Sequence, residues 1–208
     1  GRVPVGAVRS ESGPWAFDAP PPDLGQVVQP YGTFTEWDAQ HRFMYLEASR
    51  GCPFRCEFCL SSLSRGVRTV PLDQLFDGAR HLLSLGARQF KFIDRTFNLD
   101  YDRAAAILEF WLNEAHRGIS VQFETVPDRF PPELRDLIAR FPADTLRLEV
   151  GVQTYNPRVA RDISRLQDYE QTERTLAFLK DETRATVHAD LIVGLPGETI
   201  NSFRDGFD

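Results

Sequence analysis

Strand-like and helix-like segments alternate in strict order along this chain from residue 43 onward. The strand-like runs cover residues 43–48, 89–94, 119–124, 145–153 and 186–193. Helical patterns follow them over residues 71–86, 101–118, 132–140, 157–164, 169–181 and from 199 onward. Strands that are joined through helices in this order run parallel, with right-handed crossovers. The order therefore predicts an α/β fold in which helices cover a parallel sheet.

Polar and apolar side chains alternate along these strand-like runs. One face of the predicted sheet carries Tyr45, Glu47, Gln122, Glu124, Arg147, Glu149, Gly151, Gln153, His188 and Asp190, and the other carries Met44, Leu46, Val121, Leu146, Leu148, Val150, Val187, Ala189 and Leu191. Parallel sheets seldom leave a face bare, and a sheet covered on both faces has nearly continuous apolar strands. The alternation predicts a curled, open barrel of about five to six βα units, cut short near the C-terminus, with a polar interior. A sheet with one solvated face is the alternative.

The first 42 residues differ in composition from the rest of the chain. They contain the run Pro20-Pro21-Pro22 and few periodic apolar positions. We expect residues 1–42 to form a proline-rich N-terminal arm or linker, and residues 43–208 to form the core domain, an incomplete barrel. A chain of 208 residues can bury one sizeable core, which agrees with one domain and an extension.

Charge and hydropathy restrict the partners and the compartment. The 30 acidic residues outnumber the 24 basic ones, and the formal charge of -6 argues against a surface that mainly neutralises nucleic acid. No apolar run is long enough to cross a bilayer, and residues 1–10 lack the basic start and the apolar segment of a signal peptide. We therefore expect a cytoplasmic protein that does not associate with membranes.

All three cysteines of the chain, Cys52, Cys56 and Cys59, lie within eight residues of one another. An odd, tightly clustered set cannot form a disulfide framework, and it suits thiolates that bind metal in a reducing compartment. The cluster follows the first predicted strand. A parallel α/β barrel places its active site beyond the carboxyl ends of its strands, so the position also indicates a functional loop.

The number of thiols restricts the kind of metal centre. Structural zinc takes four ligands, and a ferredoxin cluster takes four cysteines, whereas this loop offers three. Three thiolates can hold three irons of a [4Fe–4S] cluster and leave the fourth iron open for chemistry. Zinc with a fourth ligand from elsewhere, in an interaction domain without catalysis, stays the alternative.

Residues 52–59, CPFRCEFC, resemble the Cys-x-x-x-Cys-x-aromatic-Cys signature of the radical S-adenosylmethionine (SAM) enzymes. The resemblance implies a [4Fe–4S] cluster on Cys52, Cys56 and Cys59, with SAM bound to the open iron, in a partial β/α barrel of that family. It also implies reductive cleavage of SAM to methionine and a 5′-deoxyadenosyl radical. The implied partners are a small-molecule or peptide substrate and an electron donor such as flavodoxin or ferredoxin; nucleic acid is disfavoured by the acidic charge.

Further residues carry the resemblance into the cofactor site. Phe58 resembles the aromatic residue beside the adenine of SAM. Asp94 and Thr96 follow the second predicted strand, where the family often has a Gly-Gly-Glu that contacts the methionine amino group, and this sequence departs from that motif. Ile192, at the end of the fifth predicted strand, would pack on the adenine.

The segment from Glu149 to Arg165 resembles the Gly-x-Gln motif and the downstream arginine of coproporphyrinogen oxidase and related branches. Gln153 supplies the glutamine of that motif. The resemblance places Arg165 near the carboxylate of SAM, where a charge-assisted pair could form. It leaves Glu149 either binding the ribose hydroxyls or structuring the barrel interior.

The phrase YLEASRGC at residues 45–52, with DRTFN at 94–98, most resembles radical SAM enzymes that carry a cobalamin-binding domain ahead of the barrel. The resemblance implies a methyltransferase or rearrangement enzyme, with cobalamin supplied through a domain that is not in this chain. A coproporphyrinogen-dehydrogenase-like enzyme and a methylthiotransferase-like enzyme, the latter acting on transfer RNA, are the alternatives.

Overall fold

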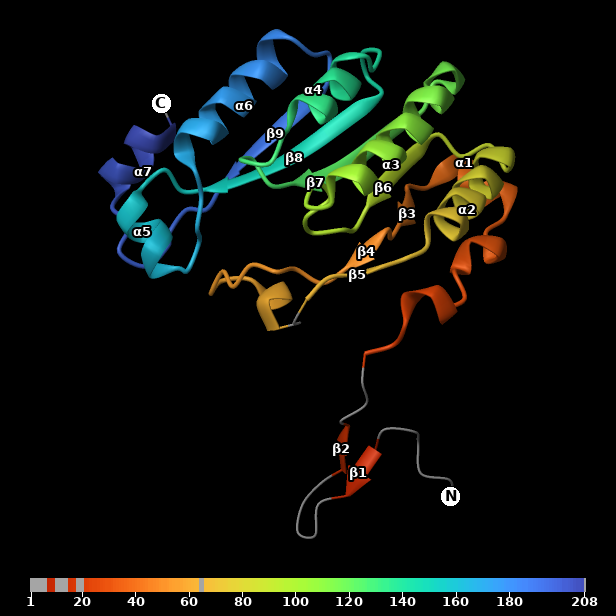
Figure 1. Cartoon of the computed structure of the whole chain (residues 1–208), viewed down its shortest axis with the longest axis horizontal. Helices are drawn as coiled ribbons and strands as arrows, with labels where there is room; N and C mark the ends of the chain where they lie inside the picture. Colours follow the sequence, from red (N-terminus) through yellow and green to blue (C-terminus); the bar gives the residue numbers. More distant parts are fainter. Residues whose placement is uncertain (1–6, 10–14, 18–20, 64–65, 208) are drawn as a thin grey trace.

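A parallel sheet of five strands forms the centre of the protein (Figure 1). The computed structural model describes residues 7–9, 15–17, 21–63 and 66–207. The five strands are β3 (Met44–Leu46), β6 (Gln89–Phe92), β7 (Ser120–Thr125), β8 (Leu146–Gln153) and β9 (Thr186–Leu191), and they lie in the sheet in chain order. Every neighbouring pair is parallel. The predicted parallel α/β fold is confirmed, and among the described residues the sheet stays open, with β3 and β9 at its edges.

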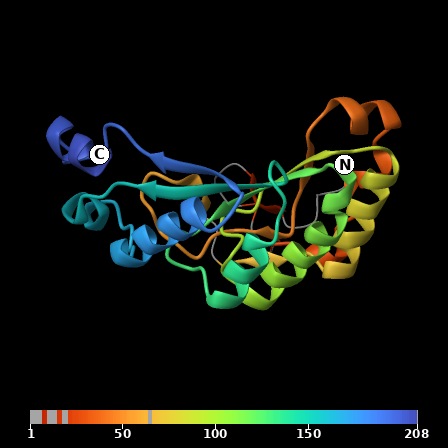
Figure 2. The same ribbon diagram turned by 90° about the horizontal axis from the view of Figure 1, so that it is seen from above.

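Helices cover one face of this sheet (Figures 1 and 2). The helices that cover it are α2 (Leu72–Ser84), α3 (Tyr101–Glu114), α4 (Pro132–Ala139) and α6 (Tyr169–Asp181), whereas α5 (Pro157–Asp162) and α7 (Ile200–Phe207) lie beyond the carboxyl ends of the strands (Figures 1 and 2). The start of α3 follows from its cap, because the Asp100 side chain accepts a hydrogen bond from the N–H of Arg103. In the described part of the chain, none of the helices has the length and apolar character needed to cross a membrane.

Smaller elements complete the described chain. β1 (Ala7–Arg9) pairs with β2 (Trp15–Phe17), and β4 (Ser49–Arg50) pairs with β5 (Arg68–Thr69), both antiparallel. A short helix, α1 (Glu36–His41), precedes the sheet. The 3-10 helices are η1 (Leu24–Gln26), η2 (Pro30–Thr33), η3 (Leu60–Leu63) and η4 (Ala115–Arg117).

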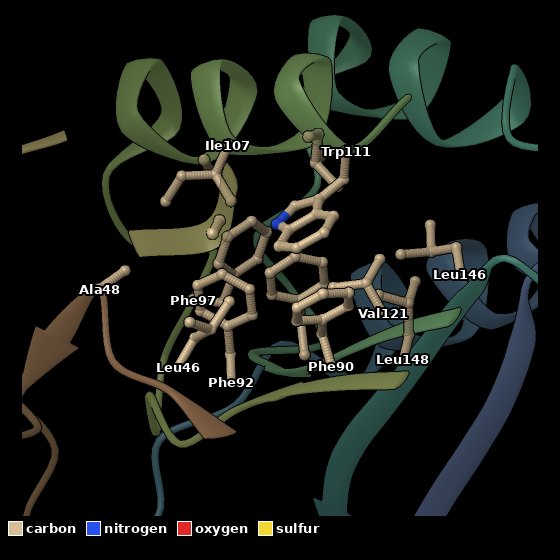
Figure 3. Close-up of a cluster of buried hydrophobic side chains, with 14 of the residues drawn as sticks. Leu46, Ala48, Phe90, Phe92, Phe97, Ile107, Trp111, Val121, Leu146 and Leu148 are labelled. Carbon is tan, nitrogen blue, oxygen red and sulfur yellow. The ribbon is translucent and has the colours of Figure 1, made fainter. Parts of the chain in front are cut away.

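The core lies between the sheet and the helices, and aromatic side chains fill its centre. Figure 3 shows Phe90, Phe92 and Phe97 gathered beneath Trp111 of α3. Phe92 and Phe97 both stack on Phe123, with ring centroids 4.6 and 4.0 Å apart. Burying each such side chain contributes about 1.5–3 kcal/mol. This cluster therefore holds α3 against the middle strands of the sheet.

The alternation predicted from the sequence is present in the structure. Along β7 and β8 every second side chain is buried against the helices, while those between are partly exposed on the other face. Tyr45, Arg147 and His188 on that polar face are exposed to solvent. Ala189, which the pattern assigned to the covered face, is also exposed because β9 lies at the edge of the sheet.

Three of the predicted strands end early in the structure, and the second of them, predicted to end at residue 94, ends at Phe92. β7 and β8 each begin one residue later than predicted. The first strand is Met44–Leu46 instead of residues 43–48, because the N–H of Ala48 turns to the side chain of Asp94, 2.9 Å away, and β4 begins at the next residue. The last strand ends at Leu191, two residues before the predicted end. All three early ends lie where the chain leaves the sheet at its carboxyl edge.

Residues 21–42 are not the extended arm that the proline content predicted. Leu24, Tyr31 and Ala39 are buried and belong to the main core. The ring of Tyr31 lies on Gly78 of α2, and its hydroxyl accepts a hydrogen bond from the N–H of Glu47 at 3.2 Å. The rest of the predicted arm forms β1 and β2 or lies outside the described residues, and the domain division at residue 42 stays a prediction.

The packing of Tyr31 against α2 can be tested by substitution of Gly78. A Cβ atom at Gly78 would collide with the Tyr31 ring, whereas nothing lies within 4 Å of a Cβ at Gly32. We expect Gly78→Ala to lower the free energy of unfolding by about 1–2 kcal/mol, since overpacking outweighs the gain of about 0.5–1 kcal/mol in helix propensity. Gly32→Ala should stay within about 0.5 kcal/mol of the wild type. Urea unfolding followed by circular dichroism measures the free energy of unfolding of both variants. Equal stability of the two variants would contradict the close contact between Tyr31 and Gly78.

Candidate active site

The cysteines lie on a loop that the β4–β5 hairpin closes at its base. Gly51 enters the loop with a φ of 107°, which a residue with a side chain rarely adopts. A Cβ at this position would also collide with the carbonyl oxygen of Gly66, which lies just before β5. The N–H of Cys59 donates to the carbonyl oxygen of Cys56 at 3.0 Å, forming a tight turn between the second and third cysteines. Glycine at the entry therefore lets the two ends of the loop approach closely.

The middle of the loop is attached to the segment that follows α5. The N–H of Glu57 donates to the carbonyl oxygen of Ile163 at 3.1 Å. The carboxylate of Glu57 accepts a hydrogen bond from the hydroxyl of Ser164 at 2.9 Å, and Ser164 has a left-handed φ of 57°. The cysteine loop is thus fixed to a segment more than a hundred residues later in the sequence.

Arg165 connects this segment to the end of β8. Its Nη2 donates to the carbonyl oxygen of Gly151, and its Nε donates to Oε1 of Gln167 at 3.0 Å. Its Nη1 lies 3.8 Å from Sγ of Cys56. The guanidinium group therefore contacts both the sheet and the cysteine loop.

The Gly-x-Gln motif has a local structural reason. Gln153 adopts a left-handed φ of 73° at a register shift between β8 and β9. Its side chain folds back over Gly151, where a Cβ atom would collide with Nε2 of Gln153. Glycine at 151 thus makes room for the glutamine amide beside the guanidinium group of Arg165.

A cavity of about 320 Å³ lies between the cysteine loop and the carboxyl ends of the strands. Its wall contains Cys52, Phe54, Cys56, Phe58, Cys59, Ser62, Arg95, Thr96, Glu124, Thr125, Val126, Pro127, Asp128, Glu149, Gly151, Gln153, Arg165, Leu166, Gln167 and Asp190. The volume suits a small organic ligand. The cavity occupies the edge of the sheet where parallel barrels bind their ligands.

Five of the seven cofactor contacts predicted from the sequence line this cavity together with the three cysteines. They are Phe58, Thr96, Glu149, Gln153 and Arg165. Asp94 is buried behind the wall, where its carboxylate accepts hydrogen bonds from Ala48 and Ser49. Ile192 packs against a small apolar cluster of Val159, Ile163 and Leu195. Direct contact of Asp94 and Ile192 with a cofactor stays a prediction.

Two ion pairs organise the polar wall. Lys91 Nζ donates to Oε1 of Glu149 at 3.0 Å, and the side chain of Gln122 donates to the same oxygen. Arg95 donates to both carboxylate oxygens of Glu124 at 3.2 Å. Burial raises the pKa of Glu124, although the charge of Arg95 acts in the opposite direction. The wall therefore offers carboxylates that already have cationic partners.

Sequence reasoning missed several residues of the wall, among them Arg95, Asp128 and Gln167. Each lies on a segment at the carboxyl edge of the sheet: Arg95 after β6, Asp128 after β7, and Gln167 after Arg165. Position beyond a strand end was the available signal.

Unpartnered polar atoms indicate that the cavity suits a polar ligand. Oγ1 of Thr96 and Nε2 of Gln167 are buried without a hydrogen-bond partner among the described residues. Leaving such an atom unpaired costs about 1–3 kcal/mol, so a ligand that pairs with it is stabilised. Thr96 is 6% exposed and lines the cavity.

The donor set fits a cluster of several irons. In the described part of the chain, no three histidine, cysteine or acidic side chains converge as ligands of a single metal ion. The three cysteines of the loop line one cavity, and cysteine thiolates are the ligands that hold iron–sulfur clusters. Burial raises the pKa of the Cys52 thiol, and a coordinating metal deprotonates such a thiol.

A family model described as the radical SAM superfamily matches residues 46–208. The chain belongs to the radical SAM superfamily. It is therefore an enzyme, and the cofactors of its family are a [4Fe–4S] cluster and SAM. The assignment confirms the resemblance carried by residues 52–59 and disfavours the non-enzymatic zinc domain.

Curated proteins with related sequences include two methylthiotransferases. The ribosomal protein uS12 methylthiotransferase RimO of Chlamydia abortus is 28% identical over 193 residues, which are 88% of this chain and 41% of the relative. The RimO protein of Symbiobacterium thermophilum is 29% identical over 197 residues, 86% of this chain and 40% of the relative. The chain thus spans about two fifths of the length of these curated relatives.

Two solved structures share the fold of this radical SAM chain. One is the radical SAM methyltransferase TsrM of Kitasatospora setae, with a TM-score of 0.70 at 21% identity over 83% of this chain and 34% of that one. The other is coproporphyrinogen III oxidase HemN of Escherichia coli, with a TM-score of 0.58 at 24% identity over 79% of this chain and 40% of that one. They support the open parallel β/α barrel predicted from the alternating strands.

The close approach at the base of the cysteine loop can be tested with two glycine variants. Gly51 and Gly66 both have a positive φ, but only a Cβ at Gly51 meets another atom. We expect Gly51→Ala to open the hairpin and to expose the buried Cys56 thiol, so that it reacts about tenfold faster with a thiol reagent in metal-free protein. Gly66→Ala carries the backbone strain without the collision and serves as the control. Equal reaction rates in the two variants would contradict the proposed close approach.

Proposed function

We propose that this chain holds a [4Fe–4S] cluster through Cys52, Cys56 and Cys59 and binds SAM in the adjoining cavity, where SAM is cleaved reductively. The observation that carries the proposal is the position of the three thiols, which share one cavity with Arg165 and Thr96. Three thiolates leave one iron of the cluster without a protein ligand, and SAM could bind there. When bound and reduced, the cluster would supply the one electron that cleaves SAM at a carbon–sulfur bond, giving methionine and a 5′-deoxyadenosyl radical.

The chain itself would bind and orient the cofactor. Arg165 is suited to pair with the SAM carboxylate, because its guanidinium group lies in the wall beside Cys56. The hydroxyl of Thr96 could pair with the amino group, since it has no partner among the described residues. Phe58 would pack on the adenine with the exposed part of its ring.

Glu149 and Gln153 lie on the strand that ends in the cavity, at positions suited to the ribose hydroxyls. Glu149 shares Oε1 with Lys91 and Gln122, and its second oxygen has no partner among the described residues. A carboxylate accepts hydrogen bonds at both oxygens, so the free oxygen could accept from a hydroxyl. An external reductant of the flavodoxin or ferredoxin class would supply the electron.

Two reactions on a substrate are supported by separate observations. A cobalamin-linked methyl transfer or rearrangement is supported by the phrase at residues 45–52 and by the fold of TsrM, whose structure holds cobalamin and a [4Fe–4S] cluster. A methylthiolation is supported by the identity of 28% to a methylthiotransferase that acts on ribosomal protein uS12. Incubating the reconstituted protein with uS12, SAM, sulfide and reductant, followed by mass spectrometry of uS12, tests the second reaction directly.

Anaerobic reconstitution with iron and sulfide tests the cofactor assignment. We expect about four irons and four sulfides per chain, and 5′-deoxyadenosine after addition of SAM and dithionite. Cys56→Ala should lose most of the iron and all of the product, because a thiolate ligand is missing. Ser61→Ala, in the same loop, is the control and should behave as the wild type. One zinc per chain without sulfide would overturn the proposal.

Binding of SAM to the reconstituted protein tests the role of Arg165. Arg165→Ala removes the proposed charge-assisted pair, so we expect the dissociation constant for SAM to rise about 10- to 100-fold. The dissociation constant of Arg165→Lys should lie between that of this variant and that of the wild type, because lysine keeps the charge but lacks the paired N–H donors of the guanidinium group. Arg161→Ala, an exposed arginine on α5, is the matched control. Unchanged affinity in Arg165→Ala with full iron content would contradict the pairing.

A further inference from the structure

Two charged side chains hold the backbone at the base of the cysteine loop. Asp94 follows β6 and is 2% exposed. Its Oδ2 accepts a hydrogen bond from the N–H of Ala48 at 2.9 Å, and its Oδ1 accepts one from the hydroxyl of Ser49 at 2.6 Å. Cys52 is the first cysteine and comes three residues after Ser49. Asp94 therefore fixes the chain just before it enters the loop.

Arg103 of α3 contacts both sides of the same base. Its Nη2 donates to the carbonyl oxygen of Ala48 at 3.0 Å and also to that of Val70. Ala48 and Val70 themselves form the next step of the hairpin, because the N–H of Val70 donates to the carbonyl oxygen of Ala48 at 2.8 Å. A single guanidinium group thus joins the chain that enters the loop to the chain that leaves it.

Asp94 and Arg103 carry opposite charges and bind the same stretch of backbone. The charge of Asp94 favours the protonated form of Arg103, whose pKa burial otherwise lowers. Burial raises the pKa of Asp94 to about 6, while the hydrogen bonds from Ser49 and Ala48 act in the opposite direction. Asp94 binds the N–H of Ala48 and Arg103 binds its carbonyl oxygen, so removing either side chain takes away a separate set of hydrogen bonds from the base of the loop.

Asp94 does not line the cavity, whereas Thr96, two residues later, does. We propose that Asp94 and Arg103 form a clamp that positions the cysteine loop, and that Asp94 acts through this loop instead of by contact with SAM. The effect of the clamp on the cluster rests on the proposed function. The clamp also orders the loop in the metal-free chain, so the clamp and the proposed function can be disproved independently.

Hydrogen exchange in the metal-free protein tests the clamp without any cofactor. We expect Asp94→Asn to speed amide exchange about tenfold in residues 51–63, with α6 unchanged, because the loop opens locally. Ser49→Ala removes one partner of Asp94 and leaves the carboxylate in place, so it should change exchange in the same direction by less. Asp77→Asn and Ser84→Ala, which alter exposed side chains on α2, are the matched controls. Equal acceleration in the loop and in α6 would overturn the clamp in favour of a general role in stability.

The reconstituted protein then separates positioning from cofactor binding. We expect Asp94→Asn and Ser49→Ala to release iron to a chelator faster than the wild type and to alter the electron paramagnetic resonance spectrum of the reduced cluster. Arg103→Lys should partly restore the retention that Arg103→Gln loses. If Asp94→Asn instead weakens SAM binding with normal iron retention and loop exchange, Asp94 is a cofactor ligand and the clamp is wrong. A wild type that takes up no iron would refute the proposed function and leave the exchange result to decide the clamp.

Discussion

The site depends on hydrogen bonds that fix one irregular loop at two places. A loop of this length has many conformations, and ordering each residue costs about 1–2 kcal/mol. The base is held by Asp94 and Arg103, which bind the backbone of Ala48 and Val70. The middle is held by Ile163 and Ser164, which bind Glu57. Asp94 follows β6, and Ile163 and Ser164 come after β8, on the other side of β7, so the loop spans the carboxyl ends of these strands and lines the cavity with them.

The sheet supports the loop and the cavity because its two faces differ: one packs against the helices and the other is polar. The buried face carries Phe90, Phe92 and Phe123, whose packing against α3 sets the positions of β6 and β7. The other face places Glu124 and Glu149 beside the cavity. Glu124 of β7 pairs with Arg95 from the loop after the neighbouring strand β6, and Glu149 of β8 pairs with Lys91 of β6, on the far side of β7. A carboxylate without such a partner would be costly to bury. The ion pairs therefore allow a polar wall in a sheet whose strength comes from the aromatic layer.

The sequence predicted those features that depend on local pattern. The strand order, the alternation of faces and the bounds of α6 followed from periodicity, and the cysteine spacing indicated the site. Features that depend on a meeting of distant segments were not predictable. Tyr31 was assigned to an extended arm, because nothing in its own segment signals that Gly78 leaves room for its ring. Nothing in the helical pattern around Arg103 indicates its role, because the two carbonyl oxygens that it binds come from distant segments of the chain.

Of the three non-glycine residues with positive φ in the described chain, Asp144 precedes β8, and the other two lie at the carboxyl edge of the sheet. Gln153 and Ser164 have positive φ without being glycine, a conformation that costs about 1–3 kcal/mol at each residue and persists where the surroundings enforce it. Both residues adjoin Arg165, whose hydrogen bond to Gly151 needs the chain to turn at each of these points. A relaxed backbone at either position would move the guanidinium group away from Cys56. The strain is therefore best understood as the cost of holding one cation beside the thiols, and the contacts of Ser164 with Glu57 offset part of it.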